Sequence, residues 1–279
     1  MQISTNKNWP EKWGLKTSIM GILNITPDSF SDGGDFFSID NALSHIDYLV
    51  NAGADIIDIG AQSTRPGSIE VGPEIEIKRL LPVLKEIRAC YPDLIISVDT
   101  FNSDVAYQAL KNGANWINDV TGGRRDNNIL NVVAEFNCPF VITHSRGNSQ
   151  NMNSLTKYEN LVTDVVDSLN QLTESALNKN ISNKNIIWDP GIGFSKETSQ
   201  NIEILKNLNE FKLSSFPLLI GASRKRFIGE LINEENPKKR DVASLAISAL
   251  CSQLNLHVVR VHNVKIHHEF LKVSDALFR

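Results

Sequence analysis

Carboxylate and amide side chains at the ends of short apolar segments form the first group of candidate functional residues. Asp99, Asn118 and Asp189 end or nearly end the stretches IISVD, WIND and IIWD. Paired carboxylates can act as general acid and base, or can accept adjacent N–H groups of a flat heterocycle, because one ionised carboxylate accepts two N–H donors at once. Lys225 could donate to a ring oxygen or nitrogen of such a guest. The residue types leave both interpretations open.

A second group carries positive charge or hydrogen-bond donors at the ends of other apolar segments. It consists of Asn24, Arg65, Arg260 and His262. Guanidinium groups match phosphate oxygens, and an asparagine side chain can supply a hard oxygen ligand to Mg²⁺ alongside phosphate. This group predicts an anionic leaving group as a guest.

Two stretches rich in hydroxyl groups, glycine and proline follow the first two apolar segments, at residues 26–34 and 62–67. Such composition is typical of lids that order over substrates. Phe30 is an apolar residue in a polar loop, so we expect it to dock against an apolar surface, and an aromatic second substrate is a candidate.

Eight apolar segments of strand length carry these residues at their ends, and segments with helical spacing of apolar residues separate them. Continuous apolar runs favour parallel strands that are covered on both faces. Eight such units without an obvious edge strand predict a single-domain α/β protein, a (β/α)8 TIM barrel, with every candidate residue on the functional rim. The predicted strands are Ser18–Asn24, Asp55–Gly60, Leu94–Asp99, Trp116–Asp119, Phe140–His144, Ile186–Asp189, Leu218–Ala222 and Val258–His262.

The length of 279 residues and the apolar content of 41% suit one barrel. We interpret residues 1–17, which contain Trp9 and Trp13, as a plug packing under the barrel floor, and residues 18–279 as the barrel domain. A net charge of −4 argues against general nucleic-acid binding. The three cysteines are widely spaced, and no apolar stretch has the length of a signal peptide or membrane span. We therefore expect a cytoplasmic protein with no membrane partner.

The chain resembles dihydropteroate synthases over Met20–Val264. The resemblance rests on MGILNITPDSFSDGG, GAQSTRPG, ISVDT, WINDV, THSRG, WDPGIGF, SRKRFIG and RVHNV, in this order. The variants GAQSTRPG and WINDV are most similar to cyanobacterial and plant-type members. The family condenses 6-hydroxymethyl-7,8-dihydropterin pyrophosphate with p-aminobenzoate to give dihydropteroate and pyrophosphate in folate synthesis. The resemblance also implies Mg²⁺, a homodimer, and sulfonamides as competitive inhibitors.

The resemblance implies a role for each matching residue. Asp99, Asn118, Asp189 and Lys225 would bind the pterin, and Arg260 would stack on its ring. Pyrophosphate would contact Ser63, Arg65, Arg260, His262 and, through Mg²⁺, Asn24. The p-aminobenzoate site would be shaped by Phe30, Asp32, Thr64, Pro66 and Phe194, with the carboxylate near Arg226 at the start of the helix after the seventh strand. The implied catalytic set is Asp32, Arg65, Asp99, Lys225, Arg260 and His262.

These residues favour dissociative substitution over a protein nucleophile, because neither Ser63 nor Ser223 has an evident base in the sequence. Cations would stabilise departing pyrophosphate, carboxylates would stabilise the pterin cation, and the arylamine would then attack. The chain departs from the commonest family pattern at Gln62, Ser195, Arg226 and Asn263. Arg226 most affects the amine site, where it could bind the carboxylate more strongly or point to solvent. We interpret His144 as a packed residue beside the floor of the predicted pterin pocket.

Two rival functions share the predicted pterin pocket. A barrel that presents methyltetrahydrofolate to a corrinoid protein would lack the two hydroxyl-rich lids found here. A catalytically inactive pterin-binding regulator would not need Arg65 and Lys225, which this chain retains.

Overall fold

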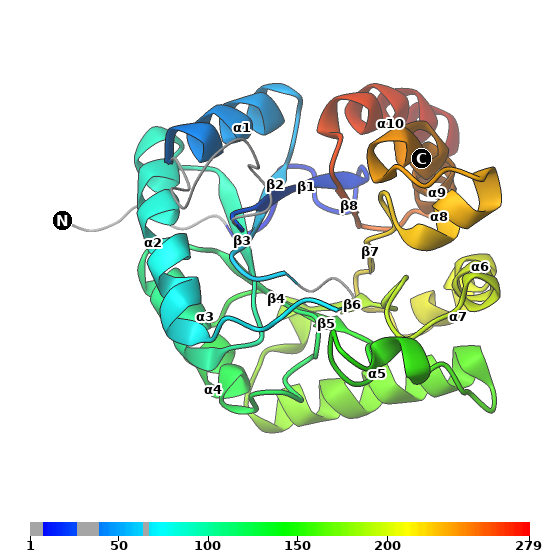
Figure 1. The fold of residues 1–279 in the computed structure, drawn as a ribbon, viewed down its shortest axis with the longest axis horizontal. Coiled ribbons are helices and arrows are strands. Elements are labelled where there is room, and N and C mark those ends of the chain that lie inside the picture. Colours follow the sequence, from blue (N-terminus) through cyan, green and yellow to red (C-terminus); the bar gives the residue numbers. More distant parts are fainter. Residues whose placement is uncertain (1–7, 27–38, 64–66) are drawn as a thin grey trace.

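Parallel strands form a ring at the centre of the molecule (Figure 1). The computed structural model describes residues 8–26, 39–63 and 67–279. Its eight-stranded sheet has the order β6-β5-β4-β3-β2-β1-β8-β7, and a parallel bridge between Trp188 and Leu218 joins β6 to β7. The strands are β1 (Ser18–Asn24), β2 (Ile56–Gly60), β3 (Ile95–Asp99), β4 (Trp116–Asp119), β5 (Phe140–Thr143), β6 (Ile186–Asp189), β7 (Leu219–Ile220) and β8 (Val258–Val261). The (β/α)8 barrel prediction is confirmed.

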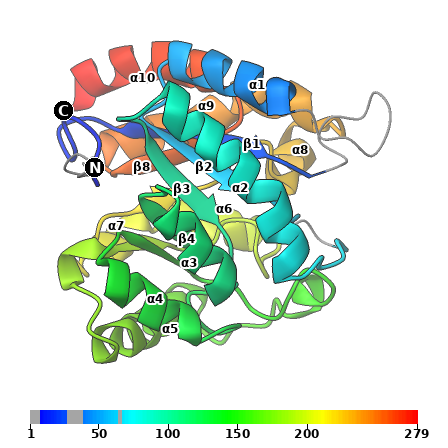
Figure 2. The same cartoon turned by 90° about the vertical axis from the view of Figure 1, so that its left-hand side faces the viewer.

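Helices alternate with the strands and surround them, and α2, α3 and α4 follow one another along the side seen in Figure 2. The helices are α1 (Ile39–Asn51), α2 (Pro73–Cys90), α3 (Ser103–Lys111), α4 (Asn128–Phe136), α5 (Leu161–Asn178), α6 (Thr198–Lys206), α7 (Leu208–Lys212), α8 (Arg226–Ile232), α9 (Asp241–Gln253) and α10 (Val264–Phe278), with short 3₁₀ turns η2 (Met152–Ser154), η3 (Asn183–Asn185) and η4 (Pro237–Arg240). Apolar residues at helical spacing, such as Leu80, Leu84 and Ile87 of α2, are buried against the sheet as predicted.

The strands separate two apolar cores. The larger lies between sheet and helices, and the smaller fills the barrel interior with Met20, Ile56, Ile95, Trp116, Val141, Ile187, Leu219 and Val258. Trp9 and Trp13 pack against the inner core, with ring centroids 5.3 and 5.7 Å from that of Trp116. The Nε1 of Trp116 donates to the carbonyl oxygen of Asn8 at 2.6 Å. Residues 8–17 thus cover the interior end that lies opposite the candidate site, while the domain boundary at residue 17 stays a prediction.

The seventh strand is shorter than predicted. Its apolar sequence extends from Leu218 to Ala222, yet only Leu219 and Ile220 pair as a strand, with β8. Gly221 and Ala222 are buried but have left the ladder. Apolar character alone therefore overestimated the strand, because burial here does not require pairing.

Candidate active site

Side-chain alternation along the strands places the candidate residues inside the barrel at its carboxyl end, which we call the mouth. Side chains two residues apart on a strand share a face. Ile95 and Trp116 belong to the inner core, so Asp99 and Asn118 point inward four and two residues further on. The same relation holds for Asn24, Asp189 and Arg260, which follow Met20, Ile187 and Val258 of the inner core.

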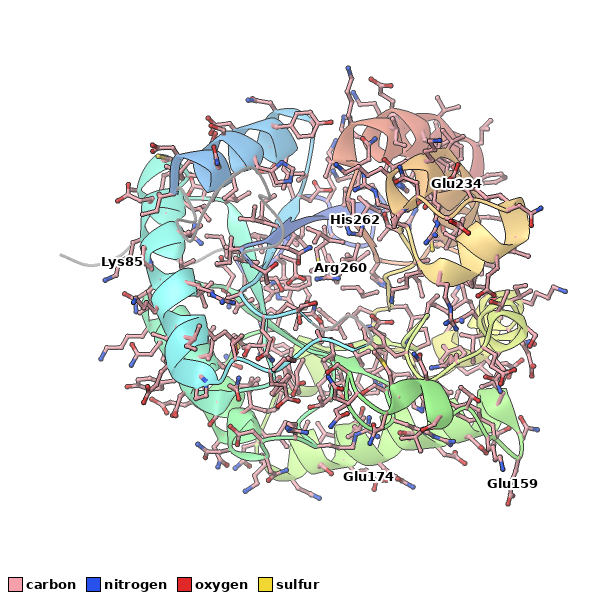
Figure 3. The ribbon with its side chains drawn as sticks, in the orientation of Figure 1. Lys85, Glu159, Glu174, Glu234, Arg260 and His262 are labelled. Atoms are coloured by element: carbon pink, nitrogen blue, oxygen red, sulfur yellow. The ribbon has the colours of Figure 1, made fainter. Side chains whose placement is uncertain are left out.

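Arg260 connects three strands at the mouth. Its Nε lies 2.6 Å from Oδ2 of Asp58, and its Nη2 lies 2.8 Å from Oδ2 of Asp99. Oδ2 of Asp58 also accepts a hydrogen bond of 3.0 Å from Nδ2 of Asn118. Figure 3 shows Arg260 and His262 within the ring of helices, whereas Lys85, Glu159 and Glu174 lie at its outside. One cation, two carboxylates and an amide therefore form a continuous network.

Burial perturbs the acidity of Asp99. Loss of solvent raises the pKa of its carboxyl to about 7, although the charge of Arg260 lowers that pKa and the charge of Asp58 raises it further. Asp99 is 8% exposed. A carboxyl in this state changes protonation near neutral pH, which is a property of many functional sites.

Asp189 and Lys225 lie on the opposite side of the mouth. Burial raises the pKa of Asp189, while the charge of Lys225 lowers it. Burial likewise lowers the pKa of Lys225 to about 8, and the charge of Asp189 opposes that change. Nζ of Lys225 donates to the carbonyl oxygen of Ile192 and lies 4.4 Å from the ring centroid of Phe194. Phe194 thus lies beside Lys225, one of the predicted pterin contacts.

His262 makes a contact that the sequence did not reveal. Its Nδ1 lies 3.0 Å from Oγ of Ser223, and its backbone N–H donates to the same oxygen at 3.2 Å. The expectation that Ser223 has no neighbouring base is therefore wrong. The ends of the adjacent strands β7 and β8 bring Ser223 and His262 together. Ser223 is buried, and its two contacts fix the orientation of the His262 ring.

Asn24 lies next to Gly60, which is its register partner on β2, and Gly60 in turn pairs with Asp99 on β3. A Cβ added to Gly60 would lie 3.4 Å from Oδ1 of Asn24 and 3.9 Å from Oδ2 of Asp99. The missing side chain leaves space between these two oxygens at the mouth.

The remaining predicted residues lie further out or outside the described residues. Arg226 is exposed at the start of α8, and its Nε pairs with Oε1 of Glu230 at 3.2 Å. Ser63 and Phe194 line a cavity of about 370 Å³ beside the mouth, together with Phe101, Met152 and other rim residues. The predicted residues Phe30, Asp32, Thr64, Arg65 and Pro66 lie outside the described residues.

Sequence reasoning missed two buried charged residues near the mouth. Asp58 is fully buried in the middle of the apolar stretch IIDIG, and a carboxylate in a buried strand was the available signal for it. Lys196 is 5% exposed and lies 2.9 Å from Nδ1 of His144. No spacing in the sequence predicts the contact between Lys196 and His144.

The barrel and its mouth define the class of protein, and the family comparison agrees. A model of pterin binding enzymes matches residues 20–262, so the chain belongs to that family. A dihydropteroate synthase of Synechocystis is 42% identical over 96% of this chain and 92% of its own length. Within the family, the chain belongs with the dihydropteroate synthases, which are transferases of folate synthesis.

Solved structures give the same relationship. The chain is similar to a dihydropteroate synthase of Clostridium difficile crystallised in the presence of pteroic acid, with 40% identity, a TM-score of 0.90, and coverage of 96% of this chain and 98% of that one. A Yersinia pestis dihydropteroate synthase in a sulfonamide complex has 34% identity, a TM-score of 0.89 and 95% coverage of both chains.

Some relatives are longer. A folic acid synthesis protein of Pneumocystis carinii is 44% identical over 94% of this chain, and the chain spans 36% of its length. The chain spans about half of the plant bifunctional folate synthesis proteins, for example 54% of that of Pisum sativum.

Proposed function

We propose that this chain condenses 6-hydroxymethyl-7,8-dihydropterin pyrophosphate with p-aminobenzoate, releasing pyrophosphate and forming 7,8-dihydropteroate. The contact between Arg260 and Asp99 carries the proposal, because it joins a phosphate-binding cation to an acceptor for a heterocycle in one barrel mouth. The two halves of a single substrate could therefore bind side by side. The relationship to dihydropteroate synthases supports the same reaction.

In this proposal, Asp99, Asn118 and Asp189 accept or donate hydrogen bonds at the edge of the pterin. Lys225 donates to a ring acceptor from the far side of the mouth, where its charge lies near that of Asp189. Arg260 stacks on the ring, with its guanidinium already held by two carboxylates. A guanidinium fixed in this way loses little conformational freedom when the substrate binds.

The pyrophosphate group would contact Arg260, His262 and Ser63, together with Arg65. Asn24 would hold Mg²⁺, since its Oδ1 borders the open space above Gly60 and Mg²⁺ commonly takes one or two protein oxygens with phosphate and water. Within the described residues, no group of three or more His, Cys, Asp or Glu side chains is arranged for a metal ion. A single amide ligand is consistent with a Mg²⁺ ion that binds together with the pyrophosphate. The ion would neutralise charge on the pyrophosphate.

The p-aminobenzoate ring would pack on Phe194, and Phe30, Asp32, Thr64 and Pro66 would complete its site. Its carboxylate would lie toward the start of α8, near Arg226. Because Arg226 already pairs with Glu230 and is exposed, its contribution to binding would be small.

The mechanism that we propose is dissociative although His262 lies beside Ser223, because Oγ of Ser223 is buried and already accepts from the backbone N–H of His262. Arg260 and His262, with Arg65, would stabilise the charge that develops on the leaving group. The carboxylates of Asp99 and Asp189, with Asp32, would stabilise the pterin cation, and the amine of p-aminobenzoate would then attack it. The surrounding loops would exclude water from that cation.

A direct assay tests the proposal. Purified chain with Mg²⁺, the pterin pyrophosphate and p-aminobenzoate should yield dihydropteroate by mass spectrometry and equimolar pyrophosphate. Asp99→Asn should weaken pterin binding in a calorimetric titration while the circular dichroism spectrum stays unchanged. Absence of product from the unmodified chain would refute the assignment, and unchanged pterin affinity in Asp99→Asn would refute the role of that residue.

A homodimer is part of the proposal, and helix α9 supports it. The residues that α9 buries are Ser244, Ser248, Cys251 and Ser252, whereas its Val242 is 75% exposed. Ala243, Ile247 and Leu250 of α9 are partly buried and pack against the core, so the exposed Val242 is the large apolar side chain that α9 offers to a second copy. We also propose sulfonamides as competitors of p-aminobenzoate.

No helix within the described residues could span a membrane, and a cytoplasmic location stays a prediction.

A further inference from the structure

The turn between β6 and α6 holds Asp189 in place through its own backbone. The N–H of Gly191 donates to Oδ1 of Asp189 at 2.8 Å. Gly191 has φ of 70°, and a Cβ at this position would lie 1.8 Å from the carbonyl oxygen of His144. The position of the Gly191 peptide therefore sets the direction of the Asp189 carboxylate.

Lys196 fixes this turn from its buried side. Its Nζ donates to the carbonyl oxygens of Gly191 at 3.1 Å and Phe194 at 3.2 Å, and it lies 2.9 Å from Nδ1 of His144. An ammonium group has three N–H donors and no acceptor. The three acceptors around Nζ of Lys196 match those three donors.

His144 is suited to be the third acceptor. Burial, together with the nearby charge of Lys196, lowers the pKa of His144 to about 2, so the imidazole is neutral. Burial lowers the pKa of Lys196 to about 7, and in its charged form the ammonium donates to Nδ1 of His144, which leaves the ring proton on Nε2. Nε2 is buried and makes no hydrogen bond among the described residues.

The opposite side of the same turn belongs to the mouth. Lys225 donates to the carbonyl oxygen of Ile192 and lies over the ring of Phe194. Two lysines thus contact successive carbonyl groups of one turn from opposite sides. Lys225 is partly exposed, whereas Lys196 is enclosed by protein and is 5% exposed.

We propose that Lys196 is a positioning residue, which orients the Asp189 carboxylate through Gly191 and the wall of the amine site through Phe194. It contacts neither substrate. This inference rests on the proposed function, because it assigns Asp189 to the pterin and Phe194 to p-aminobenzoate. It predicts that one buried side chain affects the binding of both substrates at once.

The test compares Lys196→Met with the unmodified chain and with Lys206→Met, which removes an exposed lysine from the last turn of α6. Affinity for pteroic acid is measured by calorimetry, and KM for p-aminobenzoate and kcat are measured separately. Loss of three buried donors should weaken pteroic acid binding and raise KM for p-aminobenzoate about tenfold each. Lys206→Met should leave both values unchanged.

A purely structural role would lower the midpoint of thermal unfolding and the amount of active protein, without changing KM or the dissociation constant. Such a result for folded Lys196→Met overturns the positioning role alone. If Lys196→Met does not fold, Lys196→Gln takes its place, because the shorter amide cannot reach both carbonyl groups, and the same two outcomes apply. An unmodified chain that fails to bind pteroic acid would instead overturn the proposed function and this inference with it.

Discussion

Nε of Arg260 lies 2.6 Å from Oδ2 of Asp58, a residue that is itself fully buried in β2. Oδ2 of Asp58 accepts from Asn118 as well, while its Oδ1 has no hydrogen-bond partner among the described residues. Asp58 therefore lies beneath the mouth, where its charge holds the guanidinium that reaches Asp99. The orientation of Arg260 depends on a carboxylate that substrate need not touch.

Asp58→Asn should destabilise the fold and leave the guanidinium of Arg260 held by Asp99. Removing one partner of a buried ion pair is costly, and we expect about 2 kcal/mol here because the Arg260 side chain retains Asp99 and some solvent. The pKa of Asp99 should also fall, since the charge of Asp58 helps to raise it. Urea unfolding and titration of Asp99 by NMR measure the two effects. A variant with wild-type stability and an unchanged Asp99 pKa would contradict the network.

Pterin binding should depend on pH with a narrow maximum. Asp99 accepts N–H donors when ionised, so affinity should fall as pH drops below the pKa of about 7. Lys225 donates best when charged, so affinity should also fall above its pKa of about 8. Calorimetry across this range should give a bell-shaped profile whose two apparent pKa values belong to the coupled site.

Two variants show which residue is responsible for the acidic limb of that profile and which for the alkaline limb. Asp99→Asn should lose the acidic limb, and Lys225→Gln should lose the alkaline limb; a flat profile in the unmodified chain would contradict the prediction.

The free energy of unfolding should respond to the ionisation of Asp99 in the opposite direction to pterin affinity. Its pKa is raised above the value of about 4 in an unfolded chain, so its stabilising contribution is present below pH 4 and is lost as pH rises through about 7.

The barrel could be predicted from sequence because each strand is a continuous apolar run with turn residues after it. β1, β4 and β6 begin and end where predicted, and β2, β3, β5 and β8 differ by one residue at one end. Asp99, Asn118 and Asp189 were identifiable for the same reason, since strand ends in a barrel converge. Asp58 was not, because it interrupts an apolar run and was taken as part of the strand.

Other features depend on three-dimensional contacts that no local pattern encodes. Lys196 meets His144 because β5 and β6 are parallel neighbours, so the turn after β6 lies beside the residue that follows β5; the two residues are 52 positions apart in sequence. Ser223 meets His262 because β7 and β8 are neighbours. Arg226 looked like a site residue in sequence, yet the helix it begins gives it Glu230 as a partner one turn later.

Gly191→Ala should be far more damaging than Gly14→Ala. Both glycines have positive φ, of 70° and 75°, so both variants incur backbone strain of about 1 kcal/mol. Only at Gly191 would the new Cβ also collide with a backbone carbonyl, whereas nothing lies within 4 Å of it at Gly14. We expect a loss of at least about 4 kcal/mol, or failure to fold, for Gly191→Ala. Comparable urea midpoints for the two variants would refute the close approach to His144.

Val242→Asp should convert the proposed dimer to monomers. An aspartate at position 242 of α9 would have to be desolvated in the proposed interface, at a cost that a surface charge does not incur. Light scattering should give twice the chain mass of 31.1 kDa for the unmodified protein and a lower value for the variant. Leu177→Asp is the control, because Leu177 is 39% exposed on α5, on a different side of the barrel (Figure 1). Equal masses for unmodified chain and Val242→Asp would exclude α9 as the contact surface, and equal loss of mass in Leu177→Asp would show that the effect is not specific to that face.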